Sequence, residues 1–201
     1  MEQISKVIHK QVLTTLNSSD NPTALCKDFG QKGLQVRAKF GTAEDFIAKA
    51  SPQVQAKFAA KPKSAIMGDY PTLRDINEAY GKNFAAEWLT PHLTDLSLMT
   101  GAKNITEYQH KQLAIIIATE YFWLKVTELM IFFHRFKLGK YGKFYGAVDP
   151  IVITSALLDF MDDRNYLIGI YEQEERERRE AEERKNAISY EEFLKQRNQT
   201  T

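Results

Sequence analysis

The sequence contains little of the chemistry on which disulfide-rich domains and metalloproteins depend. It has one cysteine, Cys26, and four histidines among 201 residues. One cysteine excludes an internal disulfide framework and every Cys-rich zinc pattern. The histidines stand singly, without the His-x-x-x-His spacing that would bring two of them onto one helical face. We therefore expect neither a metal nor a cofactor.

An excess of charge of one sign is also missing. Lysine and arginine total 27 and aspartate and glutamate 26, which gives a net charge of +1 at neutral pH. This balance excludes a generally polycationic nucleic-acid coat, so any nucleic-acid binding must come from a local patch. Residues 1–13 include an early acid and alternate polar with apolar side chains, unlike a secretory signal. We expect a cytoplasmic protein without a membrane partner.

Familiar catalytic motifs are absent from the sequence as well. It has no Gly-x-Ser-x-Gly elbow, no Gly-x-x-x-x-Gly-Lys-Ser/Thr phosphate loop and no Rossmann glycine fingerprint. We predict that the protein is not an enzyme. A metal-dependent enzyme built on Glu120, Glu128 and Asp163 is the open alternative. We expect these acids instead to pair with Arg135, Arg164 or Lys125, or to lie at the rim of the bundle.

Helical periodicity is what the chain has in quantity. It predicts an all-α, single-domain helical bundle with a long buried central helix and a charged C-terminal helical arm. We divide the chain into short, loosely packed N-terminal helices over 1–66, a helical core over 67–171 and an arm over 172–201. Capping signals mark helix starts at Thr42 with Asp45, at Ser51-Pro52 and at Thr106 with Gln109.

The N-terminal residues predict one short amphipathic helix that ends before a cluster of loop-favouring residues at 17–22. Its apolar positions recur at helical spacing and are Ile4, Val7, Ile8, Val12 and Leu16.

The predicted central helix runs from Glu107 to about Lys137 without a proline or glycine. Its best membrane-spanning window, 113–133, contains Glu120, Lys125 and Glu128. A central charge costs about 2.5–3.5 kcal/mol on insertion scales. The pattern therefore favours a buried bundle helix over a membrane span.

A further helix is predicted to begin at Pro150, capped by Asp149. Over 172–185 it holds seven glutamates against five arginines and lysines. Acid-to-base neighbours at i,i+4 stabilise an exposed helix, so this part should stand in solvent. The candidates to face the core are Ile151, Ile153, Ala156, Leu157, Leu158, Phe160 and Met161.

The turn between these two helices, 134–145, is the main candidate binding site. It combines cations and aromatic rings with glycines and no acid, and these are the features with which single-stranded nucleic acid is bound. The alternative is a connection whose rings fold back onto the core and whose lysines are merely solvated. The candidate residues for nucleic-acid or partner binding are Arg135, Lys137, Lys140, Tyr141, Lys143 and Tyr145.

The end of the arm is the second candidate. A capping signal at Ser189 with Glu192 predicts a last short helix that bears Tyr190, Phe193 and Leu194. These three side chains could dock in a partner's groove. Alternatively, the segment folds back onto its own domain.

The order of features over 105–195 resembles uncharacterised helical proteins of Bacteroidota-type phages and mobile elements. The resemblance rests on the Phe-x-x-Gly-Lys-Tyr-Gly-Lys-Phe-Tyr-Gly-x-Val-Asp run over 136–149, followed by Arg164 and the element at 188–194. The pattern is also loosely similar to replicative helicase loaders. Residues 146–150 depart from it, because this chain has Gly-Ala-Val-Asp-Pro there.

The resemblance implies a non-ATPase adaptor in DNA replication. Its partner would be a replicative helicase or other replication protein, with single-stranded DNA as a further ligand and a homo-oligomer as a possible assembly. The alternative is a structural or host-interaction protein, a virion component or an inhibitor of host defence, that acts through the arm.

Overall fold

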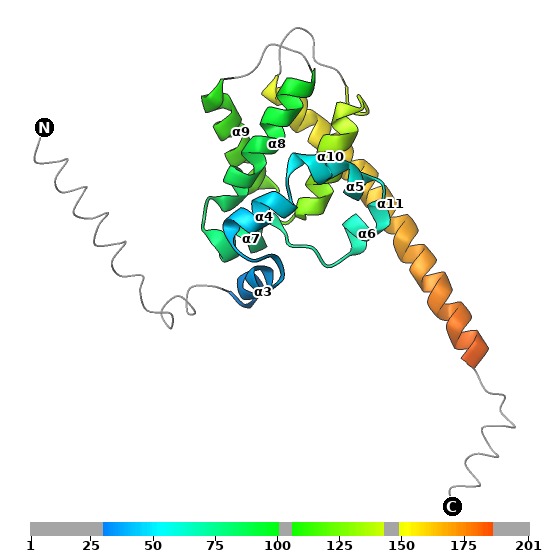
Figure 1. The fold of residues 1–201 in the computed structure, drawn as a ribbon. Helices are drawn as coiled ribbons and strands as arrows, with labels where there is room; N and C mark the ends of the chain where they lie inside the picture. Colours follow the sequence, from blue (N-terminus) through cyan, green and yellow to red (C-terminus); the bar gives the residue numbers. More distant parts are fainter. Residues whose placement is uncertain (1–29, 101–105, 143–148, 187–201) are drawn as a thin grey trace, which may run out of the picture.

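The computed structural model describes residues 30–100, 106–142 and 149–186 (Figure 1). Regular structure in these ranges is helical, apart from an isolated β-bridge between Thr72 and Lys125. The all-α prediction is confirmed. The helices are α3 (Gln31–Phe40), α4 (Ala43–Lys49), η1 (Pro52–Val54), α5 (Gln55–Ala59), α6 (Pro62–Met67), α7 (Leu73–Tyr80), α8 (Phe84–Thr100), α9 (Glu107–Glu120), α10 (Val126–Lys137) and α11 (Pro150–Asn186).

Short capping motifs set several of these starts. The capping boxes predicted at Thr42 and Thr106 are present: each hydroxyl accepts from the backbone N–H three residues on, and that residue's side chain accepts from the cap. A third box, between Thr72 and Asp75, begins α7. Such boxes satisfy backbone donors that a helix start leaves unpaired.

Loose packing was predicted for 1–66, and this is wrong for the described part, 30–66. Phe46 and Ile66 belong to the same buried core as the later helices. Trp88 of α8 donates its indole N–H to the carbonyl of Ala50 at 2.8 Å. These helices are short and bury at most two residues each, so they give too little periodicity for the sequence to reveal their packing.

The predicted helix over 107–137 is broken into α9 and α10 by residues 121–125. Backbone pairing with another segment replaces the lost helical hydrogen bonds: Leu73 and Arg74 donate to the carbonyls of Leu124 and Phe122, at 3.0 and 2.8 Å. The Glu128 carboxylate accepts from the Lys125 N–H and caps α10. A distant segment therefore causes this break, since residues 121–125 themselves include neither proline nor glycine.

Helix α10 is the buried centre of the bundle. Every residue from Val126 to Phe133 is buried, on all sides of the helix. It packs against α5, α6, α8 and α11. The buried central helix predicted from the sequence is thus present in shortened form. No helix in the described ranges is long and apolar enough to cross a membrane.

Helix α11 begins at Pro150, as predicted, with the Asp149 carboxylate accepting from the Ile151 N–H. Two predicted core residues face solvent instead: Ile151 is 72% and Leu158 60% exposed. They lie on the side of α11 opposite the residues that are buried, which are Ile153, Ala156, Leu157 and Phe160.

Candidate functional site

The turn after α10 folds onto α11 around one carboxylate, that of Asp163. The Tyr141 hydroxyl donates to Asp163 Oδ2 at 2.9 Å, and the Lys140 ammonium is hydrogen-bonded to the same oxygen. Arg135 Nη1 lies 3.8 Å from it. Gly139 and Gly142 have positive φ angles of 79° and 110°, which let the chain turn back here.

The Tyr141 ring lies inside the molecule. It is buried and stacks on Phe132 of α10, with 5.9 Å between the ring centroids. It also meets Phe160 of α11 edge-on, at 6.2 Å. The ring therefore fills the space between the two helices and is not available to stack on a base.

Lys137 points to another helix. Its ammonium lies 2.5 Å from the Asp95 carboxylate of α8, and its side chain is 16% exposed. Arg135 is 19% exposed. The turn's cations therefore link α10 to the helices on either side of it.

The prediction that this turn presents its cations and rings to solvent is wrong for Arg135, Lys137 and Tyr141. The reason is tertiary packing. Asp95 of α8 and Asp163 of α11 pair with the cations. The Tyr141 ring packs between Phe132 and Phe160. Lys140 is the exception, with a side chain 48% exposed. The two remaining turn residues, Lys143 and Tyr145, lie outside the described residues.

The pKa shifts follow from this packing. Burial raises the pKa of the Tyr141 phenol to about 12, and its hydrogen bond to Asp163 acts in the same direction. Partial burial alone would raise the pKa of the Asp163 carboxyl. Hydrogen bonds from Lys140 and Tyr141, together with the charges of Lys140 and Arg135, outweigh burial and lower it. At neutral pH the cluster therefore contains a neutral phenol and an ionised carboxylate.

The three acids considered for a metal enzyme do not form one cluster. Glu128 is fully buried and pairs with Arg164 at 2.7 Å, whereas Asp163 belongs to the turn cluster and Glu120 is exposed. The predicted pairing of Glu128 and Asp163 with arginine is confirmed. In the part of the chain that the structure describes, no three potential metal-ligating side chains come together.

Sequence reasoning missed the second role of Glu128, which both caps α10 and neutralises Arg164. The Arg164 guanidinium also lies over the Trp123 ring, 5.2 Å from its centroid. The usual sequence signal for such a cap was missing, because a capping box begins with Ser or Thr and Lys125 stands at that position.

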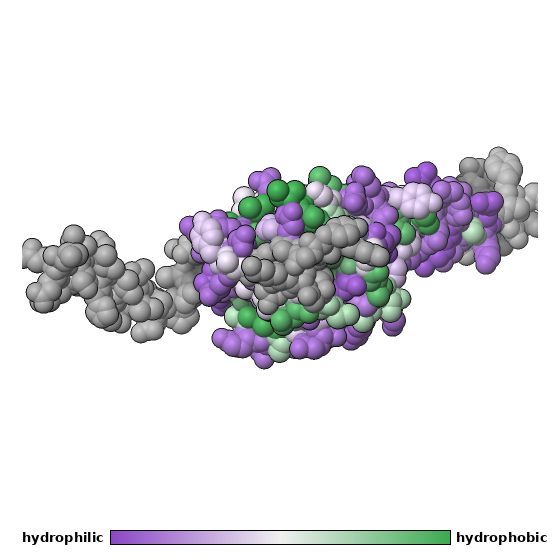
Figure 2. Space-filling view, turned by 90° about the horizontal axis from the view of Figure 1, so that it is seen from above, coloured by the Kyte–Doolittle hydropathy of each residue, from purple (hydrophilic) through white to green (hydrophobic). Residues whose placement is uncertain are grey.

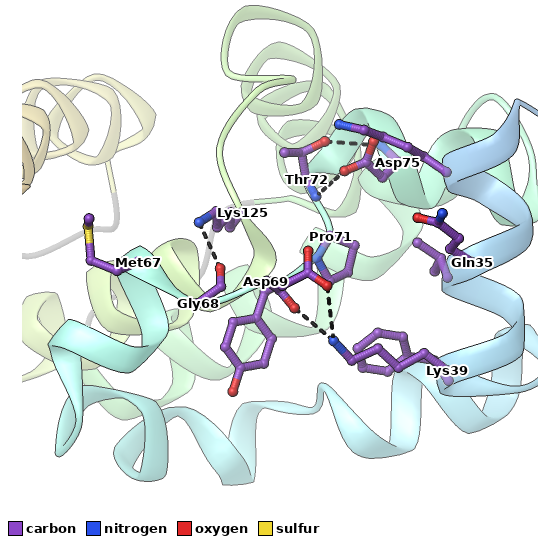
Figure 3. A pocket seen from close by; sticks show the side chains of 13 residues that line it. Gln35, Lys39, Met67, Gly68, Asp69, Pro71, Thr72, Asp75 and Lys125 are labelled. Carbon is purple, nitrogen blue, oxygen red and sulfur yellow. Dashed lines mark hydrogen bonds and ion pairs between the residues drawn. The ribbon is translucent and has the colours of Figure 1, made fainter. Parts of the chain in front are cut away.

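A cavity of about 380 Å³ lies between α3 and the segment that leads into α7 (Figure 3). At its edge the Lys39 ammonium donates to the Asp69 carbonyl at 2.8 Å. The Lys125 ammonium donates to the carbonyls of Ile66 and Gly68, at 2.6 and 2.8 Å. Because these groups are engaged with the protein itself, their geometry favours a structural role over catalysis.

The arm is partly described, as the second half of α11. Within the described residues, its last side-chain contacts with the body are made by Tyr171 and Glu174, which meet the Lys63 ammonium, the latter at 2.6 Å. Residues 175–186 then leave the body as a single helix (Figure 1). Their surface is hydrophilic in Figure 2. The predicted docking residues Tyr190, Phe193 and Leu194 lie outside the described residues.

A family model described as a family of unknown function (DUF6633) matches residues 105–200. This range includes α9, α10, α11 and the segment that follows. No curated protein and no solved structure matches the chain.

Proposed function

We propose that the protein is a non-catalytic adaptor that binds a protein partner through its arm, 172–201. The observation that supports this proposal is the departure of α11 from the body after Glu174. From residue 176 to residue 185 every side chain is exposed. A helix held away from its own domain offers all its faces to a partner.

The chemistry of this helix suits recognition. It carries acids and bases in alternation, and such surfaces guide association and choice of partner more than they add affinity. Tyr190, Phe193 and Leu194 would add the apolar anchors that a groove requires. The match to the family model extends over the same segment, to residue 200.

The resemblance to helicase loaders suggests the class of partner. We propose a replicative helicase or other replication protein of a phage or mobile element. Binding of single-stranded DNA through the turn has less support, because Arg135, Lys137 and Lys140 are paired with Asp95 and Asp163. A virion component or an inhibitor of host defence would use the same arm, and the partner's identity separates these roles.

The test is affinity purification from the native host, with mass spectrometry of what is retained. Three forms are compared: the full chain, a chain that ends at Glu175, and a full chain with Lys137→Ala and Lys140→Ala. The truncation keeps the contacts of Tyr171 and Glu174 with Lys63. We expect it to reduce capture of the partner by at least about tenfold, or 1.4 kcal/mol.

The turn variant should retain the partner at the level of the full chain. If the truncated chain still captured the partner and the turn variant did not, the proposal would be contradicted and the turn would be the binding site. Recovery of a helicase would support the replication role. Recovery of a virion or defence protein would support the alternative.

A further inference from the structure

A groove runs between α9 and the first turns of α11, and its walls are apolar. A cavity of about 210 Å³ lies in it, lined by Tyr108 and Ile116 of α9 and by Ile151 and Thr154 of α11. Tyr108, Ile116 and Ile151 are large side chains that remain exposed. Large apolar side chains gathered in one exposed place mark an interaction site more often than scattered ones do.

Helical spacing extends this groove toward the far end of α9. Leu158, one turn beyond Thr154, is also exposed. Trp123 follows the end of α9 and is held by Arg164 of α11, as described above. The cavity and the exposed apolar side chains that continue it therefore accompany most of α9, whose 14 residues span about 21 Å.

The end of the arm cannot fill this groove within the same molecule. Asn186, where α11 ends, lies 28 residues beyond Leu158 along one helix, or about 42 Å. Leu194 is eight residues further, and eight extended residues reach at most about 29 Å. The apolar side chains of the arm therefore fall short of the groove.

The chain that precedes α3 starts much closer. Gln31, at the beginning of α3, lines one cavity together with Phe122 and Trp123. These two rings lie just past the end of α9, so the chain before α3 starts near the last residues of the helix that forms one wall of the groove. The connecting residues 17–29 can span up to about 45 Å, more than the length of the groove.

We propose that residues 4–16 dock as a helix in the α9–α11 groove of their own molecule. This segment has 13 residues, about 20 Å as a helix, which matches α9 in length. Its apolar stripe of Ile4, Ile8 and Val12 faces Ile116 and the α11 side chains opposite. Its Lys6 and Lys10 lie on the polar face and remain in water. This inference is independent of the arm.

Disulfide cross-linking in the full chain tests the proposal. The natural thiol is removed by Cys26→Ser, and Val12→Cys is combined with Ile116→Cys or, in a second variant, with Leu158→Cys. The control pairs Val12→Cys with Lys57→Cys, an exposed position on α5, which packs on α10. With copper phenanthroline as oxidant, we expect both groove pairs to form an intramolecular disulfide at least about tenfold faster than the control pair, because docking raises their effective concentration.

A matched pair of substitutions checks that apolar contact is the cause. Ile8→Asp, on the apolar stripe, should slow the Val12–Ile116 cross-link by about tenfold, since it would bury a charge. Thr14→Asp, one turn from Lys10, adds the same charge on the polar face and should leave the rate unchanged. Equal rates for groove and control pairs would overturn the proposal. Disulfides found only between two molecules would also overturn it and would assign the groove to a second copy.

Discussion

Helix α10 and the projecting residues 175–186 of α11 both lack glycine and proline, yet different interactions stabilise them. From Val126 to Phe133 no residue of α10 reaches solvent, so packing on every side holds this helix. From residue 176 to residue 185 every side chain of α11 is exposed. The projecting helix continues a helix already formed against the body and needs propagation only, which is far easier than nucleation.

The comparison shows where charge belongs in each helix. Glu128 in α10 is buried and, among the described residues, forms an ion pair with Arg164. In the projecting part, pairs such as Glu180 with Arg184 stand in solvent, where each contributes about 0.2–0.5 kcal/mol. Removing one charge should therefore lower the free energy of unfolding strongly in α10 and hardly at all in the projecting part of α11.

Arg164→Ala should have the largest effect, a loss of about 3–5 kcal/mol in the free energy of unfolding, because it leaves Glu128 buried and unpaired. Denaturant titration measures it. The double variant Glu128→Gln, Arg164→Met keeps an acceptor for the Lys125 N–H and should recover a large part of the loss. A single variant that loses less than about 1 kcal/mol would place this pair among ordinary surface bridges.

Acidification should weaken the contact of α8 with α10 through His92, whose ring stacks on Phe133 at 5.5 Å. Its Nε2–H donates to the Ala50 carbonyl and its Nδ1 accepts from Gln55, so the ring is neutral. Burial lowers the pKa of His92 from 6.5 to about 4, and Lys137 acts in the same direction, against the Ala50 hydrogen bond and the charge of Asp95.

Because the folded state binds the proton more weakly, the stability that neutral His92 contributes is complete above pH 6.5. It is lost as the pH falls toward about 4, with a total of about 3 kcal/mol. Free energies of unfolding between pH 7 and pH 4 measure this. His92→Gln, which keeps an amide donor and acceptor, should flatten the slope in that window. An unchanged slope would show that other groups, such as the buried His110, cause the acid sensitivity.

The smallest effect is expected in the projecting helix. Ala181→Gly should reduce helicity seen by circular dichroism while changing the global free energy of unfolding by less than about 0.5 kcal/mol, since this part frays independently of the body. The matched control is Ala156→Gly in the buried half of α11, which should cost at least about 1 kcal/mol. Equal global losses would mean that the projecting helix has contacts with the body.

Much of the fold was accessible from the sequence because its signals are local. The capping boxes at Thr42 and Thr106 and the start at Pro150 each depend on residues within a few positions. The break after Glu120 was not accessible, because its cause is pairing with the segment around Leu73, some fifty residues away. Local patterns contain no information about such a partner.

The candidate site was predicted less well for the same reason. The cations and rings of 134–145 were predicted to form one exposed binding group. Whether a lysine meets water or an acid depends on which helix lies opposite, and here Asp95 and Asp163 lie opposite. Ile151 and Leu158 were predicted to face the core and are exposed. The sequence does not reveal this, because an apolar side chain is buried only if another element covers it.

Local patterns were enough to predict that this protein is helical, where several of its helices begin, and that the helix starting at Pro150 carries a charged, solvated stretch. These features follow from hydrogen bonds and contacts within one or two turns. The identity of the surrounded helix, of the neutralised cations and of the uncovered apolar face became visible only in the folded chain. Those outcomes depend on packing between residues far apart in the chain.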